Sequence, residues 1–248
     1  MIALKCYDYF MPQRKVKDDT IQKCQKLWER IYPQVKMPHT YYREMFYESK
    51  KEKVLEIGAG NDSALDLSDT FSVGIDIDEE ALRNNSSIKY RVVASAHALP
   101  FANSVFDTVV TQYVLEHIEK PDSAFSEISR VSQPGSQFIF LTTNSSSYLG
   151  FIFRHTPQWI HNLVKKRFIG MDEKEIYPVY MRCNTPRKIE DLLVKKGFDR
   201  PEYVFVGGPF YFQFSYVLFR LAVLAEKLTD GRLKRMKFYI AGRAVKKI

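Results

Sequence analysis

Short, mainly apolar segments constrain the fold of this 248-residue chain more than any other feature of its sequence. Each of the first five is four to six residues long, which suits a strand and is too short for a stable helix. Between them lie segments with apolar residues at helical spacing or clusters of turn residues. This alternation predicts an α/β fold, a Rossmann-like sheet of seven mostly parallel strands with helices on both faces. The predicted strands cover residues 53–57, 72–77, 90–93, 106–111, 137–142, 202–206 and 236–245.

Helices are predicted on both sides of this core. Residues 18–32 carry apolar side chains at helical spacing, and Pro33 ends that helix. Thr185 has the character of an N-cap, with Pro186 at the first helical position and Gly197 at the exit. A helical or turn segment is expected at 40–49, and further helices directly after Gly60, at 122–131 (closed by Pro134-Gly135) and at 209–228.

No internal repeat or low-complexity linker divides the chain, so we expect one domain over residues 1–248. Residues 51–142 would form its ligand-binding core. The remaining parts would be N-terminal lid helices at 1–50 and substrate-side insertions at 143–184 and 208–234.

A glycine turn follows the first predicted strand. Open α/β sheets bind ligands at the carboxyl ends of their strands, and Gly58-Ala59-Gly60 lies at such an end. Glycine lets the backbone turn sharply and lets a ligand approach closely. Asp76 ends the second strand, where an acid can accept hydrogen bonds from both ribose hydroxyls of an adenosine. The alternative is a tight turn that uses glycine without binding anything.

The residues after the turn indicate which kind of nucleotide it suits. A dinucleotide fingerprint needs a third glycine, but this chain has Ser63 there, and Asp62 adds negative charge where a pyrophosphate would bind. No phosphate-binding P-loop sequence is present. An NAD(P)-dependent oxidoreductase is therefore the less favoured alternative, and a nucleoside without phosphates is favoured.

Successive segments of residues 54–142 resemble the motifs of class I S-adenosylmethionine-dependent methyltransferases, in order and with matching gaps. The resemblance is strongest to the methyltransferase type 11 group, whose fourth motif ends in LEH and which includes the ubiquinone and menaquinone methyltransferases. It implies the Rossmann-like fold and S-adenosyl-L-methionine as cofactor. The segments are VLEIGAG (54–60), VGIDIDEEAL (73–82), VVASAHALPF (92–101), FDTVVTQYVLEHIEKP (106–121) and SRVSQPGSQFIFLT (129–142).

The resemblance also implies roles for individual residues. Asp76 would bind the ribose hydroxyls, and Gln112 would face the methionine part and the methyl group. Ser95 stands where many relatives have an Asp that accepts the adenine amino group, which puts that contact in doubt. The cofactor-binding residues it implies are Glu56, Gly58, Ala59 and Gly60 at the methionine, Asp76 at the ribose, Ile77, Ser95 and Ala96 at the adenine, and Gln112.

Methyl transfer from a sulfonium is an in-line displacement, so the protein chiefly aligns the acceptor and excludes water. His117 is the candidate general base for a hydroxyl acceptor, the alternative being a histidine that packs its loop. His117 and the neighbouring Glu116 are too few ligands to indicate a metal site, so no metal is expected. Tyr41, Tyr42 and Arg43 are candidates to cover the cofactor, the alternative being plain packing. His155 and His161 are candidates to contact an acceptor, the alternative being surface or packing roles.

The predicted function is an S-adenosylmethionine-dependent methyltransferase acting on a small-molecule, glycan or lipid-linked acceptor, by in-line O-methylation. The non-enzyme alternative is a methyltransferase-like binding or scaffold protein without turnover. Seven of the 37 basic residues lie in 231–248, and the rest nearly balance the 29 acids, which disfavours nucleic acid as a partner.

The cysteines and the C-terminal region indicate where in the cell the protein is expected. Three scattered cysteines indicate a reducing compartment, and no secretory signal is visible, so a cytoplasmic protein is expected. The apolar run 209–228, with its aromatic residues, and the basic tail predict peripheral membrane contact through 209–248. Packing on the domain and homodimer formation are the alternatives for this surface.

Overall fold

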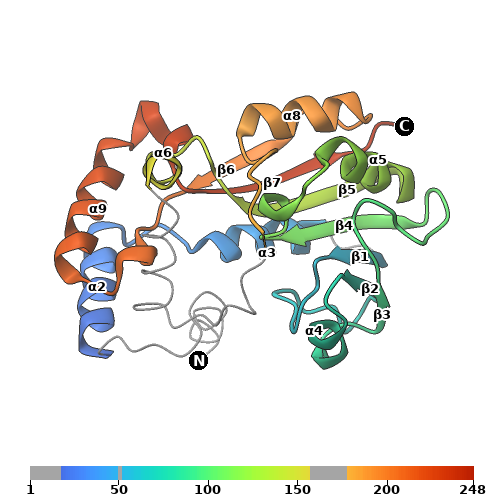
Figure 1. Cartoon of the computed structure of the whole chain (residues 1–248), viewed down its shortest axis with the longest axis horizontal. Helices are drawn as coiled ribbons and strands as arrows, with labels where there is room; N and C mark the ends of the chain where they lie inside the picture. The colour runs from blue at the N-terminus through green and yellow to red at the C-terminus, as the bar shows by residue number, and fades with distance from the viewer. Residues whose placement is uncertain (1–17, 50–51, 157–177) are drawn as a thin grey trace. The chain divides into compact units, whose positions relative to one another are not determined.

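The computed structural model describes residues 18–49, 52–156 and 178–248 (Figure 1). The chain forms two compact units. The core unit contains residues 38–143, 179–204 and 240–248. The helical unit contains the described parts of residues 1–37, 144–178 and 205–239.

One seven-stranded sheet runs in the order β3-β2-β1-β4-β5-β7-β6. Strands β1 to β5 pair in parallel with their neighbours. β7 is antiparallel to β5, because Gly135 near the start of β5 bonds to Lys246, whereas Asn144 just past its end bonds to Phe238. This confirms the predicted Rossmann-like, mostly parallel sheet. The strands are β1 (Lys53–Ile57), β2 (Phe71–Asp76), β3 (Tyr90–Val93), β4 (Phe106–Gln112), β5 (Ser132–Thr143), β6 (Glu202–Val206) and β7 (Tyr239–Val245).

Short helices accompany the sheet in the core unit, and their ends follow the sequence signals. Thr185 accepts a hydrogen bond from the Lys188 N–H, 3.2 Å away, and Gly197 leaves the helix with a φ of +85°. Both predicted ends of this helix are confirmed. The helices are α3 (Pro38–Glu48), α4 (Glu79–Asn84), η1 (Leu115–His117), α5 (Pro121–Val131) and α8 (Pro186–Lys195).

The helix predicted directly after Gly60 is wrong, because residues 61–70 form turns instead. Polar side chains here bond to the local backbone and compete with a helix. Ser63 Oγ accepts from the Leu65 N–H at 3.1 Å, and Thr70 Oγ1 donates to the Leu67 carbonyl at 2.8 Å. Leu65 and Leu67 are both buried, and this spacing of two would point them to different sides of a helix.

Two further boundaries differ from the prediction. β5 begins at Ser132, directly after α5, and continues through Pro134-Gly135, which we expected to separate helix from strand. The strand accommodates these residues through a register shift against β4 and a φ of +77° at Gly135. The run 209–228 is not one helix either: η4 (Phe210–Phe212) is followed by α9 (Tyr216–Leu228), which Ser215 caps.

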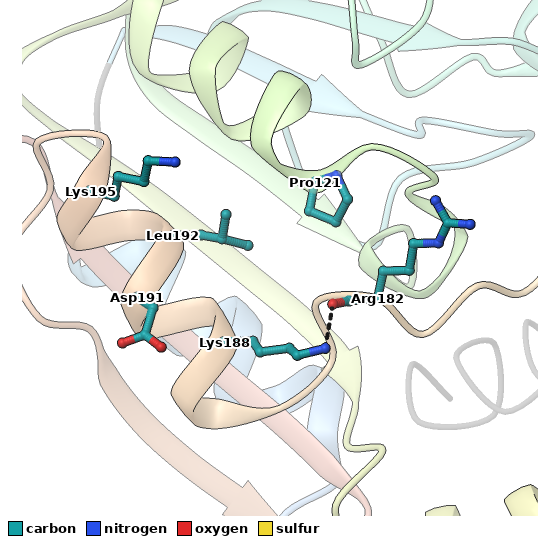
Figure 2. Close-up of a pocket in the computed structure, with 6 residues that line it drawn as sticks. All are labelled: Pro121, Arg182, Lys188, Asp191, Leu192 and Lys195. Carbon is teal, nitrogen blue, oxygen red and sulfur yellow. Dashed lines mark hydrogen bonds between the residues drawn. The ribbon is translucent and has the colours of Figure 1, made fainter.

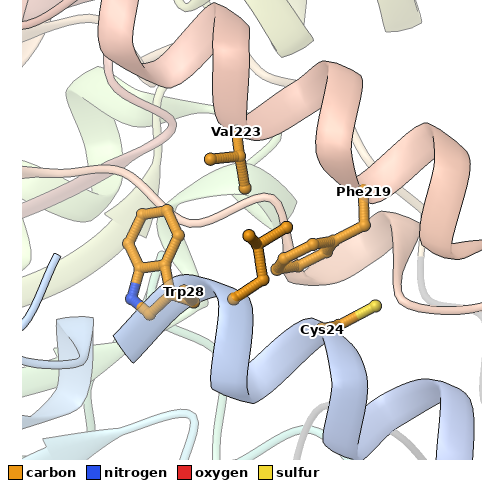
Figure 3. Close-up of a cluster of buried hydrophobic side chains, with 5 residues drawn as sticks. Cys24, Trp28, Phe219 and Val223 are labelled. Carbon is orange, nitrogen blue, oxygen red and sulfur yellow. The ribbon is translucent and has the colours of Figure 1, made fainter. Parts of the chain in front are cut away.

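The helical unit is built on the contact of α2 (Asp18–Ile31) with α9. Figure 3 shows Trp28 and Cys24 of α2 facing Phe219 and Val223 of α9. Trp28 also packs edge-on against Phe210, with ring centroids 5.4 Å apart. The unit's other described helices are α6 (Tyr148–His155), η4 and η5 (Gly231–Met236).

A buried ion pair joins several segments of the helical unit. Glu226 is completely buried on α9, and its carboxylate accepts from Lys237 Nζ at 2.7 Å and from the Tyr148 hydroxyl at 2.6 Å. Lys237 also donates to Asp230 at 2.8 Å, and Asp230 accepts from the Tyr32 hydroxyl at 3.0 Å. A buried charge is tolerated only with such partners, so the pair fixes which side of α9 faces inward.

The two faces of α9 predict opposite responses to truncation. Phe219→Ala should lower the free energy of unfolding by about 3–4 kcal/mol, because it opens a cavity against α2. Leu221→Ala, on the same helix and 58% exposed, should change it by about 0.5 kcal/mol or less. Urea unfolding followed by circular dichroism measures both. Equal losses for the two variants would contradict the described orientation of α9.

Candidate functional site

The parallel register of three strands builds the site. Ile57 at the end of β1 pairs with Ile75 of β2 on one side and with Thr111 of β4 on the other. The next residues, Gly58, Asp76 and Gln112, therefore lie beside one another at the carboxyl edge of the sheet. This is the ligand-binding edge of open α/β sheets.

Gly58 makes a close approach that any larger residue would disturb. Its φ is +72°, and its N–H donates to the Ile75 carbonyl at 2.8 Å. A Cβ at this position would lie 2.1 Å from Val114 Cγ2, in the segment after β4. Glycine is required here by conformation and by space, which gives the predicted glycine turn its physical reason.

Asp76 holds the glycine turn together. Its Oδ2 accepts from the Gly60 N–H at 2.8 Å, and its Oδ1 accepts from the Asp78 N–H at 3.0 Å. Each carboxylate oxygen keeps a second lone pair, so both can still accept from a ligand hydroxyl. Sequence reasoning gave Asp76 a binding role and missed this structural one.

An apolar surface follows Asp76. Ile77 is 66% exposed, and Val93, which ends β3 and pairs with Asp76, is 55% exposed. Exposed branched side chains at the ends of two neighbouring strands suit a flat, apolar ring such as adenine. Ala96, a few residues after β3, is buried.

His97 engages Ser95, a contact that the sequence reasoning missed. Ser95 Oγ accepts from the His97 N–H at 3.2 Å and lies 3.0 Å from its Nδ1. The Lys120 N–H donates to Nε2 of His97 at 3.2 Å. Nε2 therefore carries no proton, so Nδ1 donates to Ser95, whose own hydroxyl proton is left to point elsewhere.

The segment after β4 is held in an uncommon conformation. Tyr113 has a φ of +56° without being glycine, and its N–H donates to the Leu141 carbonyl at 2.7 Å. Gln112 before it is half-buried at the strand end, and His117 is half-buried in η1. Left-handed backbone at non-glycine residues is often found beside functional sites.

Glu116 belongs to the framework of this segment. It is buried, and its Oε2 accepts from the Thr142 hydroxyl at 2.8 Å. Its carbonyl accepts from the N–H groups of Tyr180 at 2.8 Å and Met181 at 3.1 Å. Burial raises the pKa of Glu116, which favours the neutral acid. Among the residues that the structure describes, no three His, Cys, Asp or Glu side chains gather as metal ligands.

Glu56 has a carboxylate oxygen that lacks a partner. The side chain is 3% exposed at the end of β1, and no described residue bonds to its Oε2. Burial raises its pKa to about 8, against the opposing effect of the Ser63 hydroxyl. A cationic ligand beside Glu56 would supply the missing partner. The ammonium and sulfonium of S-adenosylmethionine have that charge, so the residues present fit this cofactor.

The remaining candidates lie elsewhere or outside the described residues. Tyr42 of α3 is completely buried, so its ring is not exposed to cover a cofactor, whereas Tyr41 and Arg43 are half-buried. His155 is exposed on α6, where its Nδ1 lies 2.8 Å from the Phe151 carbonyl. His161 lies outside the described residues.

A pocket beside α8 is separate from the predicted cofactor residues, none of which lines it. Figure 2 shows Pro121 at the start of α5 opposite the side chains of α8. The basic groups lining it already have partners: Arg182 donates to the Glu119 carbonyl, Lys188 to the Arg182 carbonyl, and Lys195 to Asp122. We therefore do not assign an anion site there.

Comparison with known proteins identifies a domain within the chain. Residues 55–140 match the family model described as a methyltransferase domain. Residues 55–140 therefore form a methyltransferase domain, and the chain is similar in sequence to named methyltransferases. The resemblance to methyltransferases seen in its sequence is confirmed over this domain.

Individual relatives cover different shares of the chain. An uncharacterized protein of Methanocaldococcus jannaschii is 28% identical, over 78% of this chain and 81% of its own. A ubiquinone/menaquinone biosynthesis C-methyltransferase of Francisella tularensis is 26% identical, over 60% of this chain and 62% of its own. The solved structure of a SAM-dependent methyltransferase from Methanosarcina mazei superposes with a TM-score of 0.53 at 18% identity, covering 82% of this chain and 97% of that one.

The pKa of Glu56 predicts a pH-dependent stability. The unfolded chain releases this proton near pH 4.5, whereas the folded protein without cofactor keeps it until about pH 8. This group therefore makes the protein less stable as the pH rises between those values. Glu56→Gln should remove that slope and raise the free energy of unfolding at pH 8 by about 4 kcal/mol. Urea unfolding across this pH range measures it.

Glu52→Gln is the matched control, because Glu52 is an exposed acid next to the same strand. It should keep the pH slope of the original protein. A Glu56→Gln variant with an unchanged slope would show that Glu56 is ionised in the folded protein.

The close approach at Gly58 can be separated from its backbone conformation. Gly58→Ala should destabilise the protein by about 3 kcal/mol or more, since it adds both left-handed strain and a clash with Val114. Gly135→Ala adds the strain alone, because nothing lies within 4 Å of its Cβ, and should cost about 1 kcal/mol. Thermal unfolding compares them. Equal losses would refute the close contact.

Proposed function

We propose that this methyltransferase moves a methyl group from S-adenosylmethionine to an oxygen of a small-molecule, glycan or lipid-linked acceptor at the edge formed by β1, β2 and β4. The observation that carries the cofactor site is the buried Glu56 carboxylate, with an oxygen lacking a partner, beside the Gly58 turn and Asp76. A buried acid beside a glycine turn and a strand-end aspartate suits a cationic nucleoside without phosphates.

Each proposed cofactor residue has a chemical task. Glu56, Gly58, Ala59 and Gly60 would hold the methionine part, and Asp76 would accept from the ribose hydroxyls. Ile77 would pack on the adenine, with Ser95 and Ala96 at its edge. Gln112 would face the methionine part from the end of β4. When bound, the cofactor supplies a methyl group made electrophilic by its sulfonium.

The chain's own contribution to the reaction is alignment and proton transfer. An in-line displacement needs the acceptor oxygen held opposite the leaving sulfur, with water excluded. His117 lies five residues past Gln112, in η1, and is half-buried. We propose that its imidazole accepts the proton of the acceptor hydroxyl. Glu116 and Thr142 would fix the backbone that carries it.

Methylation at carbon is the second candidate. The relatives named as ubiquinone/menaquinone biosynthesis enzymes are C-methyltransferases. An activated phenolic ring loses a proton from oxygen before its carbon attacks, so the same base at His117 would serve. The position of the label in the isolated product distinguishes the two reactions.

The proposed acceptor classes suit the rest of the chain. The apolar and basic region 209–248 favours a lipid-linked or amphipathic acceptor and peripheral membrane contact over nucleic acid. No helix among the described residues is long and apolar enough to cross a bilayer. A homodimer through the same region is the competing arrangement.

Cofactor binding is the direct test. Calorimetry with S-adenosylmethionine should give a dissociation constant in the micromolar range, and Asp76→Asn should raise it at least about tenfold by weakening the ribose contacts. Asp69→Asn, an exposed acid in the loop before β2, is the control and should bind normally. The site would be refuted if Asp76→Asn bound the cofactor with unchanged affinity, or if the original protein gave no binding heat.

Turnover is tested with methyl-labelled cofactor and a cell extract. The original protein should label a lipid or small-molecule fraction, and the label should be found in a methyl ether of the product if a hydroxyl oxygen is the acceptor atom. His117→Ala should lower the rate about 100-fold while calorimetry shows unchanged cofactor affinity. No labelling by a protein that binds the cofactor would favour the scaffold alternative.

A further inference from the structure

α9 presents an apolar stripe to solvent. Val217 is 67% exposed, Leu221 58%, Leu224 55% and Leu228 71%. These spacings of four, three and four place the four side chains within an arc of about 60° along the whole helix. A continuous exposed row of this kind marks an interaction surface more often than isolated apolar residues do.

The opposite face of α9 is fixed in the interior of the helical unit. Phe219, Ala222, Val223 and Glu226 are buried and lie about half a turn from the stripe. Phe219 and Val223 pack against α2, as Figure 3 shows. Glu226 binds Lys237 and Tyr148. Rotating the helix to bury the stripe would expose Phe219 and separate the Glu226 carboxylate from Lys237 and Tyr148. The stripe therefore remains exposed to solvent.

Basic residues flank the stripe. Arg220 and Lys227 lie about a quarter-turn from its centre, and Lys234 and Arg235 follow in η5 next to Leu233, which is 49% exposed. These four bases are exposed and form no ion pair with any residue that the structure describes. Residues 209–236 contain two acids: Glu226 is buried, and Asp230 is bound to Lys237 and Tyr32.

We propose that this face, the α9 stripe with its flanking bases, docks the protein on an anionic lipid surface. The stripe would enter the boundary between headgroups and acyl chains, and the bases would meet the lipid phosphates. With 13 residues, α9 is about 20 Å long, short of the roughly 30 Å of a bilayer core, so it lies in the interface. The docking does not depend on which acceptor is methylated.

The membrane surface differs from the one expected from the sequence. We expected aromatic residues of 209–228 to form it, but Phe219 is completely buried and Phe210 packs against Trp28. The exposed surface is aliphatic. Phe219 and Phe210 hold α9 against α2, and the leucines remain for the lipid.

The residues that flank the stripe are all basic, which favours an anionic lipid surface over a second copy of the chain as its partner. A twofold contact through the stripe would bring Arg220 and Lys227 close to the same bases of the other copy, with no exposed unpaired acid in 209–236 to offset them. An anionic bilayer offers apolar depth and negative charge together.

Co-sedimentation of the full chain with vesicles tests the proposal. Binding is expected to vesicles of phosphatidylcholine with about 30% phosphatidylglycerol, and at least about tenfold weaker to phosphatidylcholine alone. Leu221→Gln with Leu224→Gln should reduce binding at least about tenfold, and Lys227→Gln with Lys234→Gln about fivefold. Val194→Gln, an exposed apolar residue on α8, and Lys26→Gln, an exposed base on α2, are the matched controls.

Circular dichroism and cofactor calorimetry accompany every variant. Both should be unchanged, because none of these residues lies in the cofactor site, so a failure of docking is distinguished from a failure of methyl transfer. Equal vesicle binding by the stripe variants and the controls would overturn the proposal. So would light scattering that shows a dimer which the Leu221→Gln with Leu224→Gln variant converts to a monomer.

Discussion

The parallel pairing of β1 between β2 and β4 is the constraint on which the site depends. It fixes the register in which Ile57 meets Ile75 and Thr111, and so brings three loops to one edge. The turn after β1 then passes so close to Val114 that only glycine fits at position 58. Asp76 closes the arrangement by accepting from the Gly60 N–H. A ligand at this edge meets a backbone that is already in place before it binds.

Around this edge, the polar groups divide between framework and binding. Glu116 and His97 are engaged by hydrogen bonds within the core unit, which holds η1 and the loop after β3. Glu56 is different, because one of its buried oxygens has no partner among the described residues. Leaving a buried acceptor unpaired costs stability, so a site that tolerates it is one where a ligand supplies the missing group. This contrast separates Glu56 from the other buried acids.

The helical unit uses its polar and apolar groups in a different way. Aromatic packing between α2 and α9 and the buried pair of Glu226 with Lys237 fix one side of α9 inward. The cost of leaving Glu226 unpaired keeps the helix from turning. The exposed leucines are therefore a consequence of what is buried behind them, and the surface they form is available for a partner.

The sequence by itself determined the order and type of the strands, the Gly58 turn, the methyltransferase domain and the ends of α8, because these depend on local pattern and on residue chemistry at fixed spacing. Tertiary structure decided the loop at 61–70, where Leu65 and Leu67 are buried two residues apart, and the path of β5 through Pro134-Gly135. It also decided which face of α9 is exposed and which acids have partners. A one-dimensional pattern shows that 209–228 is strongly apolar, but only packing against α2 and the burial of Glu226 select the apolar side that remains in solvent.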